Sequence, residues 1–235
     1  MFAHVRLITF DLDDTLWPCA PVIQAAEQES YTWLECQAPR LTQRHSPQDL
    51  RTHRMQLARS QPEIAHDLTE LRLRSLAMLL EDAGYPRHLA QHANDLFRTA
   101  RNRVTPYEEV ATELARLRQR YTLVSVTNGN SQIEHTPLHA SFDHSLTAAE
   151  VGAAKPDPAI FHAASERSGI PLDAFLHVGD DPERDVEAAR RLGIRTVWVN
   201  RSGSDWPDDL EPADIEVEDL TALVAILDDS HSVGP

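Results

Sequence analysis

The stretch Val5–Trp17, VRLITFDLDDTLW, decides how the rest of the chain is interpreted. Its first six residues, Val5–Phe10, predict a strand that is buried on both faces. Three carboxylates, Asp11, Asp13 and Asp14, follow this strand at once. Ligands bind at the carboxyl ends of strands in open α/β sheets, so a carboxylate at this place is a candidate site residue. Taken alone, the same acids could form a solvated turn that caps a helix.

The composition argues against several classes of protein. The chain has 235 residues, of which 41% are apolar, enough for a core and a smaller inserted unit. Its 22 basic and 37 acidic residues give a net charge of −15, which argues against nucleic acid or an anionic membrane as a partner. Two cysteines, Cys19 and Cys36, without a CxxC motif predict neither a disulfide framework nor a zinc site. Neither a signal peptide nor an apolar run of roughly 18 residues is found, so we expect a cytoplasmic protein.

Four helices are predicted directly after the first strand, and no strand pattern interrupts them. The third is the clearest, because its leucines recur at helical spacings and Gly84 follows its end. Consecutive helices predict a helical bundle at residues 18–103, inserted into a core formed by residues 1–17 and 104–235. The four helices are expected at Val22–Glu35, Pro47–Arg59, Glu63–Ala83 and Arg87–Arg103.

Strands and helices alternate in the remainder of the chain. This alternation predicts an α/β fold with a doubly wound parallel sheet. The polar residues after Leu227 are expected to be disordered. The predicted strands are Thr122–Val126, His144–Ala148, Phe175–Val178 and Thr196–Val199. The predicted helices are Pro106–Arg120, Pro158–Gly169, Pro182–Leu192 and a last one that contains Leu220 and Leu227.

Three polar clusters fall at predicted strand ends and should meet at one edge of the sheet. Crowded carboxylates repel one another unless a cation offsets their charge, and oxygen ligands without histidine or cysteine indicate a hard ion such as Mg²⁺. Magnesium fills its shell with water and phosphate oxygens, which suggests a phosphoryl ligand. The clusters are Asp11 with Asp13, Thr127 with Asn128, and Asp180 with Asp181 and Asp185.

Lys155 is the single lysine among the 22 basic residues, and it precedes a predicted helix in the segment KPDP. A compact ammonium can approach a phosphoryl oxygen or a carboxylate where the planar guanidinium of arginine is too large. The lysine is followed by Pro156, so the chain has no Walker A motif, and it has neither a GxGxxG nor a GxSxG motif. These absences exclude the P-loop, dinucleotide-binding and serine-hydrolase classes.

The segments FDLDDTL, TNGN, KPDP and GDDxxxD, in this order, resemble the four signature motifs of the haloacid dehalogenase (HAD) superfamily, specifically its phosphatases. The resemblance implies a HAD-like, Rossmannoid core, and the inserted helices resemble the cap of one subclass. A narrower resemblance, carried by FDLDDTLW, PEIAHDLTELRLRSL, TNGN and LHVGDD, is to bacterial flavin-pathway phosphatases. Those enzymes act on 5-amino-6-(5-phosphoribitylamino)uracil and on FMN, which would place the chain in riboflavin biosynthesis.

The superfamily resemblance implies a role for each motif residue. Asp11 would attack phosphorus and become an aspartyl phosphate, and Asp13 would protonate the leaving alcohol. Thr127 and the Asn128 amide would bind phosphate oxygens, while Lys155 would offset the negative charge beside Asp11.

The resemblance also implies a Mg²⁺ cofactor. Its ligands would be Asp11, the backbone carbonyl of Asp13, and Asp180, with Asp185 or Asp181 acting through water. The expected partner is a small-molecule phosphate ester, and either a monomer or a homodimer is compatible with the sequence. Three alternatives stay open: a phosphatase of sugar phosphates or nucleotides, a haloacid dehalogenase, and a phospho-accepting signalling module on a similar sheet.

Overall fold

The computed structural model of this chain describes residue 2 and residues 4–232. Backbone contacts divide the chain into two units, each described here by itself. The core unit comprises Met1–Pro18, Thr105–Gly129 and Pro137–Pro235, and the helical unit comprises Cys19–Val104 and Asn130–Thr136.

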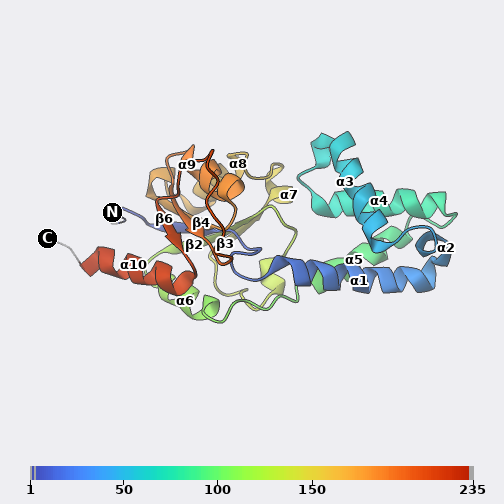
Figure 1. Cartoon of the computed structure of the whole chain (residues 1–235), viewed down its shortest axis with the longest axis horizontal. Coiled ribbons are helices and arrows are strands. Elements are labelled where there is room, and N and C mark those ends of the chain that lie inside the picture. The colour runs from blue at the N-terminus through green and yellow to red at the C-terminus, as the bar shows by residue number, and fades with distance from the viewer. Residues whose placement is uncertain (1, 3, 233–235) are drawn as a thin grey trace. The chain divides into compact units, whose positions relative to one another are not determined.

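Six parallel strands form one sheet in the core unit, in the order β3-β2-β1-β4-β5-β6 (Figure 1). The sheet order reverses at β1, because β2 pairs with one of its edges and β4 with the other. This is the kind of switch point at which open α/β sheets bind ligands. The doubly wound parallel sheet predicted from the sequence is confirmed. The strands are β1 (Leu7–Phe10), β2 (Thr122–Thr127), β3 (His144–Thr147), β4 (Phe175–Gly179), β5 (Arg195–Val199) and β6 (Ile215–Val217).

Helices cover both faces of this sheet (Figure 1). On one face α8 (Ala159–Ser168) and α9 (Ala188–Arg190) pack on the strands, and on the other α6 (Val110–Leu117) contacts α10 (Leu220–Ser232). Because both faces are covered, all four residues of β1 are buried. The short helix α7 (Ala148–Val151) and a 3₁₀ turn, Leu172–Ala174, complete this unit together with a π-helical turn, Pro182–Glu187. The core on the α8 side includes Leu7, Val124, Leu146, Ile160, Phe161, Phe175 and Ala188.

The helical unit is built around α1, which packs against α5, while α4 contacts both α5 and α3. Its apolar core joins side chains of α1, α4 and α5, including Leu34, Leu76, Leu80 and Ala93. The elements are α1 (Cys19–Gln37), α2 (Pro39–Thr42), α3 (Pro47–Ser60), α4 (Leu68–Asp82), α5 (Leu89–Arg101) and two 3₁₀ turns, Pro62–Ile64 and Ile133–His135. None of the helices in the described part of the chain combines the length and the apolar composition needed to cross a bilayer.

Segment 130–136 belongs to the helical unit, although the sequence-based division assigned it to the core. The Asn130 side chain donates a 3.2 Å hydrogen bond to Thr69 Oγ1, and the Gln132 backbone N–H donates a 2.9 Å bond to Asn102 Oδ1. These partners lie more than 25 residues away in the sequence, so no local pattern reveals the pairing.

Three predicted helices differ from those observed. The helix expected over Pro182–Leu192 is a π-helical turn, Pro182–Glu187, followed by the short α9, which ends at Arg190. The helix expected over Glu63–Ala83 is wrong as one element, because the side chain of Asp67 accepts hydrogen bonds from the backbone N–H groups of Thr69 and Glu70 and starts α4 anew. The helix expected from Pro106 begins at Val110 instead.

The end of the chain also differs from its prediction. The short edge strand β6 was not predicted, because three residues are too few to show a period. The disorder expected after Leu227 is wrong as far as Ser232, where α10 ends. Residues 233–235 lie outside the described part of the chain.

Candidate active site

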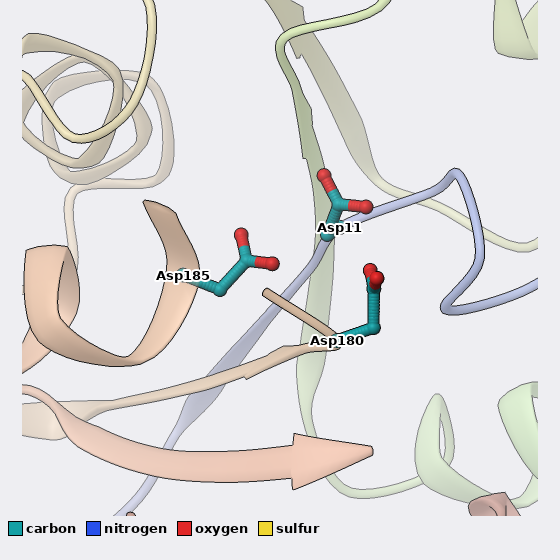
Figure 2. A group of neighbouring side chains, drawn as sticks. All are labelled: Asp11, Asp180 and Asp185. Atoms are coloured by element: carbon teal, nitrogen blue, oxygen red, sulfur yellow. The ribbon is translucent and has the colours of Figure 1, made fainter. Parts of the chain in front are cut away.

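Three carboxylates meet at the carboxyl ends of β1 and β4. Asp11 follows β1, Asp180 follows β4, and Asp185 lies in the π-helical turn that comes next. One carboxylate oxygen from each residue lies within 4.8 Å of the others. Figure 2 shows the three side chains grouped together, with Asp185 and Asp180 on either side of Asp11. The structure therefore brings together three of the residues that the sequence analysis selected.

Lys155 joins two of these carboxylates. Its Nζ donates hydrogen bonds to Oδ1 of Asp11 and Oδ1 of Asp185, each at 2.6 Å, and to the carbonyl oxygen of Val126 at 3.0 Å. Only 3% of Lys155 is exposed. All three hydrogens of the ammonium thus have acceptors inside the protein, as a buried charge requires. These three hydrogen bonds fix the position of Nζ.

The charges of this cluster perturb one another. Burial raises the pKa of Asp11 well above its ordinary value, and Asp185 and Asp180 add to this effect against the attraction of Lys155. Burial, reinforced by Asp185, also raises the pKa of Asp180 to about 7. Burial acts the same way on Asp185, but Lys155 and a hydrogen bond from His177 outweigh it and lower its pKa. Burial opposes the charge of Lys155, but Asp11 and Asp185 raise its pKa overall. Lys155 therefore stays protonated opposite the ionised Asp185.

The three carboxylates fit a hard divalent cation. They offer oxygen atoms alone, and a single ammonium beside three acids leaves excess negative charge that a cation would offset. Both oxygens of Asp185 already accept hydrogen bonds, Oδ1 from Lys155 and His177 and Oδ2 from the backbone N–H of Asp181. This engagement favours Asp11 and Asp180 as direct ligands and Asp185 as a residue that acts through water.

Asp181 has a different task from its neighbour Asp185. Its Oδ1 accepts hydrogen bonds from the backbone N–H groups of Glu183 and Arg184 at 3.0 and 2.8 Å, which caps the π-helical turn. Of the two acids that the sequence left open for a water-mediated metal contact, only Asp185 belongs to the carboxylate triad.

The loop after β1 places Asp13 and Thr15 on different partners. Oδ1 of Asp13 accepts a 2.9 Å hydrogen bond from the indole nitrogen of Trp17, and the Asp13 carboxylate is not part of the triad. Thr15 donates to Oδ1 of Asp180 at 2.9 Å. Between them, Asp14 adopts a left-handed conformation with φ of 60°, which turns the chain sharply enough to aim these side chains apart.

Asn128 and Thr127 shape the loop after β2. The Asn128 side chain donates a 2.8 Å hydrogen bond to the carbonyl of Lys155 and accepts a 2.7 Å bond from its backbone N–H. The hydroxyl oxygen of Thr127 accepts from the backbone N–H of Gly129 at 2.9 Å. The Asn128 side chain thus binds both the backbone N–H and the carbonyl of Lys155, which fixes the backbone of this residue.

Known proteins resemble this chain in sequence and in fold. A sequence profile of the haloacid dehalogenase-like hydrolases matches residues 5–193. This chain belongs to the haloacid dehalogenase-like hydrolases. The superfamily predicted from the four motifs is thereby confirmed, and the chain is an enzyme. Similarity to hydrolases speaks against the alternative of a signalling module.

Some of the similar proteins are named as phosphatases and others as haloacid dehalogenases. The 5-amino-6-(5-phospho-D-ribitylamino)uracil phosphatase YigB of Escherichia coli K12 is 33% identical over 95% of this chain and 97% of its own length. A phosphoserine phosphatase of Thermus thermophilus is 35% identical over 60% of this chain and 59% of its own. The crystal structure of a 2-haloacid dehalogenase from Pseudomonas syringae pv. Tomato DC3000 superposes with a TM-score of 0.90 and 37% identity, over 96% of this chain and 99% of that one.

Sequence reasoning missed three residues that support the HAD motifs. Each of them forms a hydrogen bond with a motif carboxylate: Thr15 with Asp180, the indole of Trp17 with Asp13, and His177 with Asp185. A signal existed for His177, because a histidine inside an otherwise apolar strand must find partners for its ring nitrogens. Thr15 lies inside the first motif and Trp17 directly after it, but the sequence does not show which residue each of them contacts.

Proposed function

We propose that this HAD-family enzyme is a magnesium-dependent phosphomonoester hydrolase that works through an aspartyl phosphate on Asp11. The buried contacts of Lys155 with Asp11 and Asp185, beside Asp180, carry the proposal. A nucleophilic carboxylate, a fixed ammonium and an all-oxygen metal set are the groups that phosphoryl transfer to an aspartate requires. The extended similarity to a relative named as a phosphatase supports the same reaction class.

In the first step, a carboxylate oxygen of Asp11 attacks phosphorus while the bond between phosphorus and the ester oxygen breaks. Asp13 gives its proton to that ester oxygen, which leaves as an alcohol. Lys155 offsets the negative charge of the phosphoryl group, and Thr127 and the backbone amide of Asn128 hold its oxygens.

In the second step, Asp13 takes a proton from a water molecule whose oxygen attacks phosphorus. The bond between phosphorus and Asp11 breaks, which restores the carboxylate and releases inorganic phosphate. Bound Mg²⁺ would be held by Asp11, Asp180 and the carbonyl of Asp13, with Asp185 acting through water, and supplies positive charge that stabilises the phosphoryl oxygens.

For the substrate, we propose ribityl phosphates that carry a pyrimidine or flavin ring, namely 5-amino-6-(5-phosphoribitylamino)uracil or FMN in riboflavin metabolism. The name of the 33% identical relative supports this choice. Sugar phosphates and nucleotides are the alternative within the same reaction class. We also propose that residues 18–103 serve as the cap that selects the leaving group, and that the enzyme works in the cytoplasm.

A panel of phosphate esters, assayed with and without Mg²⁺, tests both parts of the proposal. We expect kcat/KM for FMN or the uracil compound to exceed that for simple sugar phosphates at least about tenfold, which corresponds to about 1.4 kcal/mol of transition-state discrimination. A preference for sugar phosphates or nucleotides would contradict the substrate and leave the reaction class intact. Absence of magnesium-dependent turnover for every ester would contradict the reaction class.

A haloacid dehalogenase is the second candidate, because a structure of that name superposes on this chain with a TM-score of 0.90. Such an enzyme also uses an aspartate nucleophile, but its halide leaves without a proton, so it needs neither an acid at Asp13 nor the Asp180 carboxylate. Halide release from 2-chloropropionate is the matching assay. We expect no release above a blank, and release that persists in EDTA without any ester turnover would favour this candidate.

A further inference from the structure

His177 is a buried histidine of β4 that contacts the proposed active site from inside the sheet. Its Nε2 lies 3.2 Å from Oδ1 of Asp185, and its Nδ1 lies 2.8 Å from Oγ1 of Thr9. Thr9 and His177 are register partners on β1 and β4, and at most 1% of either residue is exposed. The two polar residues therefore form a hydrogen-bonded chain that ends on Asp185.

The carboxylate of Asp185 determines which atom donates and which accepts in each of these hydrogen bonds. An ionised carboxylate only accepts hydrogen bonds. Nε2 of His177 therefore carries the ring hydrogen and donates a hydrogen bond to Asp185. Nδ1 then accepts from the hydroxyl of Thr9, which fixes which nitrogen is protonated. Phe161 packs edge-on against the imidazole, with ring centres 4.9 Å apart and an interplanar angle of 82°. The ring is thus held by two hydrogen bonds and by packing.

Oδ1 of Asp185 connects this hydrogen-bonded series to the proposed catalytic groups. It accepts from Nε2 of His177 and, at 2.6 Å, from Nζ of Lys155, which also contacts Asp11. A rotation of the Asp185 carboxylate would therefore move the acceptor of the ammonium. Misplacement of a catalytic group by about 1 Å can cost about a hundredfold in rate.

We propose that His177, oriented by Thr9, is a positioning residue that fixes the carboxylate of Asp185 and, through it, the ammonium of Lys155 against Asp11. The kinetic consequence of this inference rests on the proposed phosphatase function, whereas its structural consequence does not. A histidine that merely filled the core would be replaceable by phenylalanine, because Phe161 offers an apolar neighbour for the ring. A positioning residue would not.

Three variants separate the two roles. Gln places a donor near the position of Nε2, Asn is too short to do so, and Phe keeps the volume without a donor. We expect His177→Phe and His177→Asn to lower kcat at least about tenfold with KM changed less than about twofold, and His177→Gln to stay within about threefold of wild type. Ser125→Ala is the control, since it removes a partly buried hydrogen bond from the buried Ser125 to Ser145 on the neighbouring strand.

The inference is wrong if the Phe variant keeps wild-type kcat. It is also wrong if the loss of kcat in all three variants follows the loss of the thermal unfolding midpoint, as in the Ser125→Ala control. Rescue by Gln but not by Asn is the pattern that a purely structural role does not produce.

The single lysine of the chain gives a readout that does not need activity. Protein labelled with ¹³C-lysine shows the Cε signal of Lys155 alone. We expect this signal to shift in His177→Phe and to keep its wild-type position in His177→Gln and Ser125→Ala. An unchanged signal in the Phe variant would overturn the inference even if wild-type turnover were absent. A shifted signal without any ester turnover would support the inference while the proposed function fails.

Discussion

Nζ of Lys155 lies 2.6 Å from Oδ1 of Asp11, although 144 residues separate the two in the sequence. Both residues are buried, so the attraction between their charges is screened weakly by solvent. Removing one member of such a pair leaves an uncompensated charge in the protein interior, which is more costly than losing an exposed ion pair. The predictions that follow use this cluster and its surroundings.

Lys155→Arg should reduce kcat/KM at least about tenfold, equivalent to about 1.4 kcal/mol. The arginine keeps the charge, but its planar group does not fit a site that one ammonium fills between Asp11, Asp185 and the Val126 carbonyl. Steady-state kinetics on the best ester checks this, with the surface exchange Arg191→Lys as control. Retention of more than about half the wild-type value, a loss below about 0.4 kcal/mol, would show that charge alone suffices.

Asp11→Asn should abolish turnover, because an amide is a poor nucleophile and a weaker metal ligand. Wild-type enzyme in EDTA should lose its activity too and regain it on addition of Mg²⁺. The exchange Asp209→Asn at an exposed position is the matched control for loss of one negative charge. Full turnover in EDTA, or a near wild-type rate for Asp11→Asn, would contradict the mechanism.

Asp13→Asn should keep metal and phosphate binding but lose most turnover of alkyl phosphates, since the backbone carbonyl remains while the proton donor is lost. The loss should be smaller for aryl phosphates, whose leaving groups need little protonation. The measurement is the ratio of kcat for a matched alkyl and aryl pair. Equal losses for both esters would argue against Asp13 as the acid.

Gly179→Ala should impair both activity and stability. A Cβ at this position would lie 2.3 Å from Cγ of Asp185, so the buried carboxylate, whose Oδ1 binds Lys155, would have to move. We expect kcat to fall at least about tenfold. Gly193→Ala is the control, because it introduces backbone strain at φ of 73° with no atom nearby, and should lower stability alone. Wild-type kcat in Gly179→Ala would show that Asp185 can shift without consequence.

Asp143→Ala should destabilise the protein at neutral pH but much less at pH 3. Burial alone would raise the pKa of Asp143, but the Leu123 backbone N–H and Arg118 outweigh it and lower the pKa. A lowered folded-state pKa means that the ionised group stabilises the fold above its unfolded pKa of about 3.9, and that this contribution is lost as the pH falls through the folded-state value. We expect a loss of about 1 kcal/mol at pH 7, since the side chain is partly exposed.

Urea unfolding of Asp143→Ala at the two pH values, with the exposed Asp209→Ala as control, measures this difference. A loss of the same size at pH 3 and pH 7 would attribute the effect to packing and not to the charge of Asp143.

The sequence was sufficient for the parts of the fold and site that depend on local patterns. β1 and the acids after it were predictable because a short apolar run ends directly in carboxylates. Lys155 was predictable because a chain that otherwise uses arginine places its single lysine before a helix. The convergence of Asp11, Asp180 and Asp185 followed from the rule that parallel strands share one carboxyl edge.

The remaining features depend on contacts between segments that are distant in the sequence or on exact backbone geometry. The Asn128 side chain pairs with the backbone of Lys155, 27 residues away, and no local pattern shows this pairing. The division of labour between Asp181 and Asp185 depends on a π-helical turn, which has no sequence signature that separates it from an α-helix. His177 has Thr9 as a hydrogen-bond partner because the two residues are paired in register on neighbouring strands. The sequence of either strand alone does not show this register.

Two separate segments of the sequence form the helical unit, which limits how this unit can be deleted from the enzyme. Excision of residues 19–104 would remove Thr69 and Asn102, the partners of Asn130 and Gln132. Segment 130–136, which directly follows Gly129 and the loop that Thr127 shapes, would then have lost these two partners. A core without the helical unit therefore requires a second excision at residues 130–136, because a single large deletion would leave this segment between Gly129 and Pro137 without its partners.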